Sequence, residues 1–140
     1  MRVRLATPDD VYREDWRDLV ERGLKAKDIN QVVSWTKLEY LAFQSLNTGL
    51  WLVAETSDSI VAHLGSVITD NQLFEGKQCT VVAWYSEHPG MGWALFRKFE
   101  AWVKTQDVKT VVVSTNYDER LDKILKKRGW MMCPSYLQVN

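Results

Sequence analysis

The spacing of apolar residues predicts two helices in the first third of the chain. After a short opening strand, Arg2–Ala6, apolar residues three and four positions apart predict a helix that starts at Thr7-Pro8 and ends near Gly23. The residues on its apolar face are Tyr12, Trp16, Leu19, Val20 and Gly23. A second helical stretch has Asp28 as a candidate N-cap and ends at Asn47-Thr48-Gly49.

The period then changes to that of strands. Three runs rich in β-branched and aromatic residues follow one another, with turn residues between them: Leu50–Thr56, Ile60–Thr69 and Gln78–Tyr85. Because the connections are short and polar, we expect these strands to pair as an antiparallel meander.

Helical and strand periods alternate in the last third. Helices are predicted over Met91–Thr105 and Asp118–Arg128, and strands over Lys109–Ser114 and Trp130–Val139. The run Val111-Val112-Val113 is typical of a strand in the interior of a sheet. A strand, helix and strand in succession over residues 78–114 predict a parallel crossover. The order β-α-α-β-β-β-α-β-α-β predicts an α+β fold, a mixed sheet flanked by helices, in one domain of residues 1–140.

Charge and length exclude several classes of function. Eighteen basic and eighteen acidic residues among 140 give a net charge of zero, which argues against general nucleic-acid binding and against attraction to anionic membranes. No apolar run reaches the roughly 20 residues of a membrane helix. Cys79 and Cys133 lie in separate predicted strands, so we expect them to be unbonded and the protein to be cytoplasmic.

The segment with the most chemical content runs from strand to glycine loop to helix. Residues Gly90-Met91-Gly92-Trp93 open the helix that follows strand Gln78–Tyr85. Free N–H groups at a helix start bind phosphate, and glycines let the backbone approach it closely. A lone Gly-x-Gly is also found in plain turns, and this one is neither a dinucleotide fingerprint nor a P-loop.

The element order and this loop together resemble the GNAT N-acetyltransferase superfamily. Four segments carry the resemblance: Arg2–Asp10, the hairpin Leu50–Thr69, the loop and helix start Gly90–Phe96, and Asp118–Trp130 with its Gly-aromatic end. The chain departs from the family pattern at three places. Glu87 replaces a usual Gln or Arg, His88-Pro89 replaces small or basic residues, and Leu125 occupies the position of a frequent catalytic Tyr.

The resemblance implies acetyl-CoA, or another acyl-CoA, as cofactor and a small-molecule or protein amine as acceptor. It implies that the amides of Gly90, Met91, Gly92 and Trp93 hold the pyrophosphate, and that N–H groups near Trp84 and Tyr85, where the strand separates from its neighbour, hold the thioester oxygen. Asn116 would contact the pantetheine arm, and His88 would be among the cofactor-binding residues of the loop.

The proton-transfer groups are open to more than one assignment. Glu87, His88 and Glu55 are candidates for the base, and Tyr117 is the nearest substitute acid. Each of these residues also has an ordinary structural interpretation as a solvated loop, strand-end or helix-start residue. The alternative function is a GNAT-fold interaction or structural protein without catalysis, similar to short divergent chains of bacteriophages, some of them virion-associated.

Overall fold

A computed structural model describes residues 1–26, 31–115, 118–133 and 138 of the chain. Its elements run in the order β1 (Arg2–Leu5), η1 (Pro8–Tyr12), α1 (Glu14–Ala26), α2 (Trp35–Thr48), β2 (Trp51–Glu55), β3 (Ile60–Asp70), β4 (Lys77–Ser86), α3 (Met91–Val103), β5 (Thr110–Val112) and α4 (Glu119–Lys127). The five strands form one sheet in the order β1-β2-β3-β4-β5. Strands β1 to β4 are antiparallel, and β4 pairs with β5 in parallel. The predicted α+β class, meander and parallel crossover are therefore confirmed.

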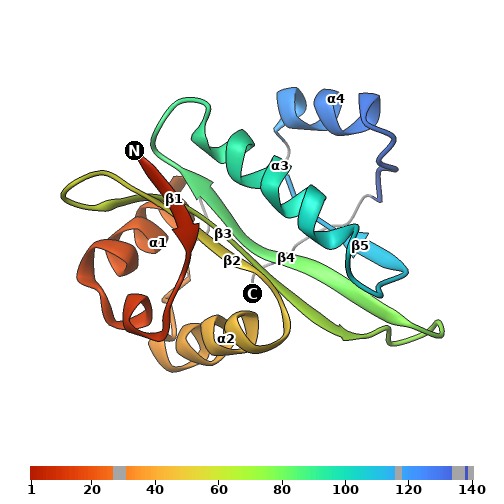
Figure 1. Cartoon of the computed structure of the whole chain (residues 1–140), viewed down its shortest axis with the longest axis horizontal. Helices are drawn as coiled ribbons and strands as arrows, with labels where there is room; N and C mark the ends of the chain where they lie inside the picture. The colour runs from red at the N-terminus through yellow and green to blue at the C-terminus, as the bar shows by residue number, and fades with distance from the viewer. Residues whose placement is uncertain (27–30, 116–117, 134–137, 139–140) are drawn as a thin grey trace.

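Two apolar clusters lie on opposite faces of the sheet, as Figure 1 shows by the placement of α1 and α2 on one side and α3 on the other. The cluster under α3 centres on Phe96, which is fully buried and stacks against Trp84 and Trp93 with ring centroids 4.8 and 5.3 Å apart. The cluster under α1 and α2 centres on Trp16 and Trp51, whose rings lie 4.8 Å apart. Both faces of the middle strands are thus covered, which explains their nearly continuous apolar sequence.

The predicted interior position of Val111–Val113 is wrong for the sheet that the described residues form. Strand β5 lies at its edge, and Val112 is 41% exposed. Val111 and Val113 face the α3 cluster, whereas α1 and α2 cover β2, β3 and β4 without reaching β5. The predicted terminal strand is not seen over Trp130–Cys133, and most of its remaining residues lie outside the described part of the chain.

The predicted first helix is divided in two. A 3-10 turn, η1, comes first, extended backbone at Arg13 interrupts it, and α1 starts at Glu14. Within η1, the Asp10 carboxylate accepts the Thr7 N–H at 2.7 Å and is bound by Arg4 at 2.7 and 2.8 Å. Tyr12 is exposed, while the other four residues of the predicted apolar face are buried.

Helix α2 begins after Ser34, whose hydroxyl accepts the Lys37 N–H at 3.4 Å, while the predicted cap Asp28 lies outside the described residues. Cys79 is buried and Cys133 exposed, and neither is bonded, as predicted. In the part of the chain that can be described, no helix has both the length and the apolar character needed to span a membrane.

Candidate functional site

Strand β4 bends at a β-bulge and separates from β5. Gly65 pairs with Ala83 while Ser66 pairs with Val81, so Val82 is an extra residue in β4. Bulges bend the strand that carries them and end regular pairing. Strand β5 pairs only with Gln78–Thr80, so within the described residues the second half of β4 has no strand on that edge. The predicted separation near Trp84 and Tyr85 is present.

The loop after β4 is a tight, internally bonded turn. Gly90 adopts φ +77°, a conformation that favours glycine, and a Cβ there would meet open space. The Ser86 hydroxyl accepts the His88 N–H at 3.1 Å and donates to the His88 carbonyl at 2.8 Å. The turn therefore delivers the chain into α3 with its first N–H groups directed outward from the helix start.

Three of the four predicted phosphate donors are available. The N–H groups of Gly90, Gly92 and Trp93 have no acceptor among the described residues. Met91 is different, because its N–H donates to the His88 carbonyl at 3.2 Å, so the expectation that all four amides are unpaired is wrong for this residue. The cause is the tight turn, which brings the His88 carbonyl over the first residue of the helix.

Aromatic side chains hold the loop against the core. The indole N–H of Trp84 donates to the Gly92 carbonyl at 2.9 Å. Trp93 stacks on Phe96 and has the Arg128 guanidinium 5.4 Å from its ring centroid. The rings of Trp84 and Trp93 are half-buried and belong to the cluster under α3, so their side chains support the loop from below.

Glu87 lies on the α1 side of β4 and is paired with a cation. Its carboxylate accepts two hydrogen bonds from Arg22 of α1, at 2.7 and 2.9 Å, and one from the Tyr85 hydroxyl at 3.4 Å. The Arg22 bonds hold the pKa of Glu87 below its ordinary value. Burial, and then the nearby Glu87 charge, raise the pKa of Tyr85, so its hydroxyl stays protonated at neutral pH.

The other candidates for proton transfer lie in different surroundings. His88 is exposed, with Nδ1 3.2 Å from the Pro89 carbonyl. Glu55 lies in an ion-pair network with Arg4 and Arg13, which favours a structural role. Asn116 and Tyr117 lie outside the described residues.

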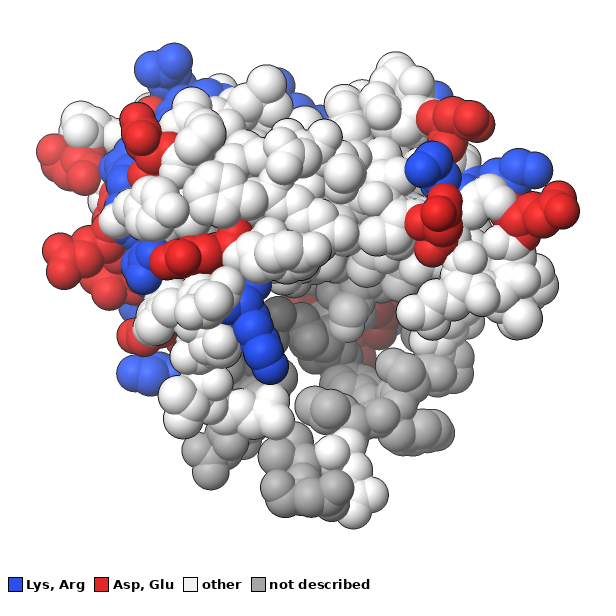
Figure 2. Space-filling model, turned by 90° about the horizontal axis from the view of Figure 1, so that it is seen from below, with Lys and Arg blue, Asp and Glu red and all other residues white. Residues whose placement is uncertain are grey.

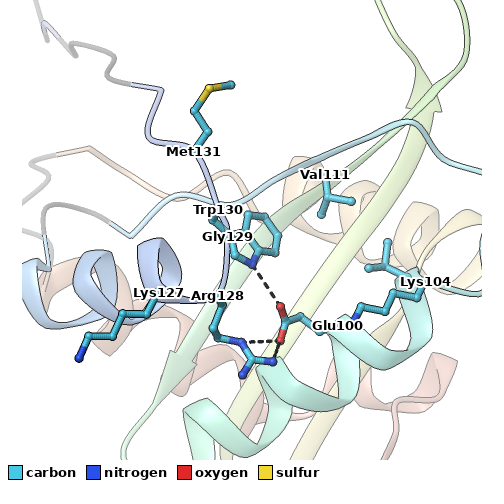
Figure 3. A pocket seen from close by; sticks show the side chains of 9 residues that line it. Glu100, Lys104, Val111, Lys127, Arg128, Gly129, Trp130 and Met131 are labelled. Atoms are coloured by element: carbon cyan, nitrogen blue, oxygen red, sulfur yellow. Dashed lines mark hydrogen bonds and ion pairs between the residues drawn. The ribbon is translucent and has the colours of Figure 1, made fainter.

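Two features of the structure, one beside Glu87 and one at the C-terminal end of α3, could not be expected from sequence. One is Arg22, which belongs to a helix 65 residues away and shows no motif. The other is a hollow of about 670 Å³ beside the C-terminal end of α3 (Figure 3), lined by Glu100, Val103, Lys104, Val111, Lys127, Arg128, Gly129, Trp130 and Met131. Glu100 is 8% exposed, and its carboxylate accepts from the Arg128 guanidinium and, at 3.1 Å, from the Trp130 indole.

The surface shows no concentrated charge of one sign on the side that Figure 2 displays. Acidic and basic side chains alternate at both ends of that face and leave an uncharged band between them. This distribution agrees with the net charge of zero. The face in Figure 2 carries no basic stripe or patch of the kind that nucleic-acid binding requires.

No protein-family model matches the chain, and no curated protein matches it. Solved structures do. A predicted acetyltransferase from Clostridium acetobutylicum, solved with acetyl-CoA, superposes with a TM-score of 0.77 at 16% identity, over 99% of this chain and 95% of that one. An aminoglycoside acetyltransferase from an uncultured soil sample, in complex with sisomicin, gives 0.70 at 14% identity over 99% and 95%.

A ribosomal-protein-alanine N-acetyltransferase from Brucella melitensis gives a TM-score of 0.69 at 12% identity, over 99% of this chain and 97% of that one. The superpositions establish the fold, whereas sequence identities this low leave the activity open. The chain has the fold of the GNAT acetyltransferases, as the resemblance implied.

Proposed function

We propose that this protein is a GNAT-type N-acyltransferase that uses acetyl-CoA or another acyl-CoA. The observation that carries the proposal is the cradle at the start of α3. Three N–H groups, of Gly90, Gly92 and Trp93, have no acceptor among the described residues and lie at the start of α3, directly after the half of β4 that β5 does not pair with. Convergent backbone donors at a helix start fit a pyrophosphate. Similarity over nearly the whole chain to an acetyltransferase solved with acetyl-CoA supports this assignment.

The residues of the cradle fit the cofactor by backbone chemistry. A Cβ at Gly90 would meet open space, and the Trp84 indole N–H holds the Gly92 carbonyl at 2.9 Å, which fixes the start of the helix. When bound, acyl-CoA supplies an acyl group activated as a thioester. The chain contributes positioning, which supplies much of the rate in direct transfer to an amine, and N–H groups near Trp84 and Tyr85 for the oxygen on which charge develops.

We propose that proton transfer involves the loop and the segment after β5. Glu87 and Tyr117 are our proposed catalytic groups, and Asn116 our proposed pantetheine contact. A base must take a proton from the incoming ammonium. The pair with Arg22 makes Glu87 a weaker base, because the Arg22 hydrogen bonds lower its pKa. The exposed His88 imidazole on the same loop is the alternative base.

The proposed acceptor is an amine, on a small molecule or on a protein. Both classes occur among the similar structures, in the enzymes described as acting on aminoglycosides and on a ribosomal-protein alanine. We propose that residues 1–140 act as one domain in the cytoplasm.

The test is cofactor binding followed by thiol release. CoA, acetyl-CoA, 3′,5′-ADP and pantetheine are titrated to 1 mM while thermal unfolding is recorded. A ligand that binds only the native state at 100 times its Kd stabilises it by about 2.7 kcal/mol, a shift of roughly 5–10 °C for a domain of this size. We expect a dose-dependent shift with CoA and acetyl-CoA and almost none with pantetheine, which lacks the pyrophosphate.

A mixture of primary amines with acetyl-CoA then tests for CoA thiol release. No shift at 1 mM CoA would refute the proposal and favour the non-enzymatic GNAT-fold protein, including a virion-associated one. A shift without thiol release from any amine would leave a CoA-binding protein whose acceptor is outside the set tested.

A further inference from the structure

An exposed ion pair connects α1 to the loop that precedes the cradle. Arg22 donates from Nε and Nη2 to the two carboxylate oxygens of Glu87, at 2.7 and 2.9 Å. The side chains are 51% and 31% exposed. Bidentate pairs of this kind fix direction as well as distance, whereas exposed pairs add little to stability. The pair therefore has more consequence for where Glu87 points than for folding.

At the end of β4, successive side chains point alternately to the α3 face and the α1 face of the sheet. Trp84 and Ser86 face α3, where both lie within 4 Å of a Cβ built on Gly92. Tyr85 and Glu87 face α1, where they meet Gly23 and Arg22. The Glu87 N–H donates to the Val61 carbonyl at 2.9 Å, which anchors the backbone at this point. The carboxylate is thus drawn to the side of the strand opposite the helix start.

We propose that Arg22 is a positioning residue for the acyl-CoA pyrophosphate, because it holds the Glu87 carboxylate on the α1 side and neutralises its charge. This inference rests on the proposed function. Glu87 lies three residues before Gly90, and without Arg22 its carboxylate would keep only the Tyr85 hydroxyl as a partner. Its negative charge, no longer neutralised, would repel a ligand that carries several negative charges. Arg22 makes an acidic residue in this loop compatible with an anionic ligand.

A double-mutant cycle tests the proposal by isothermal titration of CoA into the full chain. The variants are Arg22→Ala, Glu87→Gln and both together. We expect Arg22→Ala to weaken CoA binding roughly fivefold to twentyfold, with the loss shrinking as salt rises from 50 to 500 mM. Glu87→Gln should bind within twofold of wild type, and the double variant should regain the affinity that Arg22→Ala loses. A merely structural role for Arg22 predicts no such rescue.

A matched control is available on the same helix. Arg17 pairs with Glu39 at 2.6 Å, on a part of α1 that does not meet the loop. Arg17→Ala removes this ion pair, together with the Arg17 bond to the Val11 carbonyl, and should leave CoA affinity unchanged. Thermal unfolding of every variant without ligand separates lost folding from lost binding.

The outcomes are distinguishable. Equal CoA affinity of wild type and Arg22→Ala would overturn this inference and leave the proposed function standing. A loss that Glu87→Gln does not rescue would also overturn it, because Arg22 would then contact the ligand itself. No CoA binding by the wild-type chain would overturn the proposed function, and this inference with it.

Discussion

Gly92 is the position where sterics, helix electrostatics and ligand charge can be separated by substitution. It is the second residue of α3, and its N–H is one of the three cradle donors that have no acceptor in the described part of the chain. A Cβ built on it would lie 3.2 Å from Ser86 Cβ and 3.6 Å from Trp84 Nε1. Alanine therefore fits if Ser86 moves by a few tenths of an ångström. Asparagine and aspartate add side chains of equal size that differ in charge.

Gly92→Asp is expected to change the free energy of unfolding little and the affinity for CoA much. An acidic residue in the first turn of a helix stabilises it by about 0.3–1 kcal/mol. Replacing a helical glycine by a residue with a side chain stabilises the helix by a similar amount. Together these gains offset the tight contact of the new side chain with Ser86. We expect the free energy of unfolding of Gly92→Asp to stay within about 1 kcal/mol of wild type. A carboxylate about 5 Å from the pyrophosphate costs about 1–3 kcal/mol at effective dielectric constants between 80 and 20.

The assay is titration of CoA into wild type, Gly92→Ala, Gly92→Asn and Gly92→Asp, with chemical unfolding of each. We expect Gly92→Asp to lose at least tenfold more affinity than Gly92→Asn, and the difference to narrow in high salt. Equal losses in both would show that size alone matters. Wild-type affinity in Gly92→Asp would refute the placement of the pyrophosphate at this helix start.

Two further substitutions test packing on either face of the sheet. Phe96→Ala removes a fully buried ring that stacks on two indoles, and we expect chemical unfolding to show a loss of about 3–5 kcal/mol, with Phe96→Leu as the milder control; a loss under 1 kcal/mol would contradict the stacking. Gly23→Ala should destabilise by about 1–3 kcal/mol, although this change ordinarily stabilises a helix, because the new Cβ would lie 2.9 Å from Tyr85 Cγ. In a Tyr85→Ala background the same change should stabilise, and failure to reverse sign would contradict the contact.

Elements with a strong local period were predictable from sequence, and positions set by long-range contacts were not. The hairpin, the glycine loop and α3 carry their own signals in alternation, turn residues and a 3.6-residue period, and each lies within a few residues of its predicted bounds. The run Val111–Val113 has the composition of an interior strand but lies at an edge, because apolar composition does not say how many neighbours a strand has. The short η1 with its Asp10–Arg4 pair, and the extended backbone at Arg13 that follows it, are also not encoded in the periodicity.

In the candidate site, too, some features were predictable from sequence and others depend on long-range contacts. The phosphate-binding loop follows from Gly90 and Gly92, because a positive φ and a close backbone approach are glycine properties that a sequence displays. The surroundings of Glu87 do not follow, since its partner Arg22 comes from α1 and is brought near by the packing of Tyr85 on Gly23. The family resemblance marked Glu87 as a departure from the usual loop, and the fold supplies the cation that accommodates it.

The buried carboxylate Asp10 should make this protein sensitive to acid in a way that one substitution reveals. Burial opposes ionisation of Asp10, but bonds from Arg4 and the Thr7 N–H outweigh it and hold its pKa below the ordinary value. A lowered folded-state pKa means that the unfolded chain binds the proton more readily, so this stability is present above about pH 4 and is lost as the pH falls further. Asp10→Asn removes one of the two carboxylates that pair with Arg4 and leaves Glu55 as the other, so we expect a loss of about 1.5–3 kcal/mol at pH 7, the range for a hydrogen bond to a charged group. Urea unfolding between pH 7 and pH 3 should therefore show wild type and Asp10→Asn converging at low pH. A constant difference across that range would mean that the substitution disturbs packing, and that the Asp10 charge contributes nothing to folding.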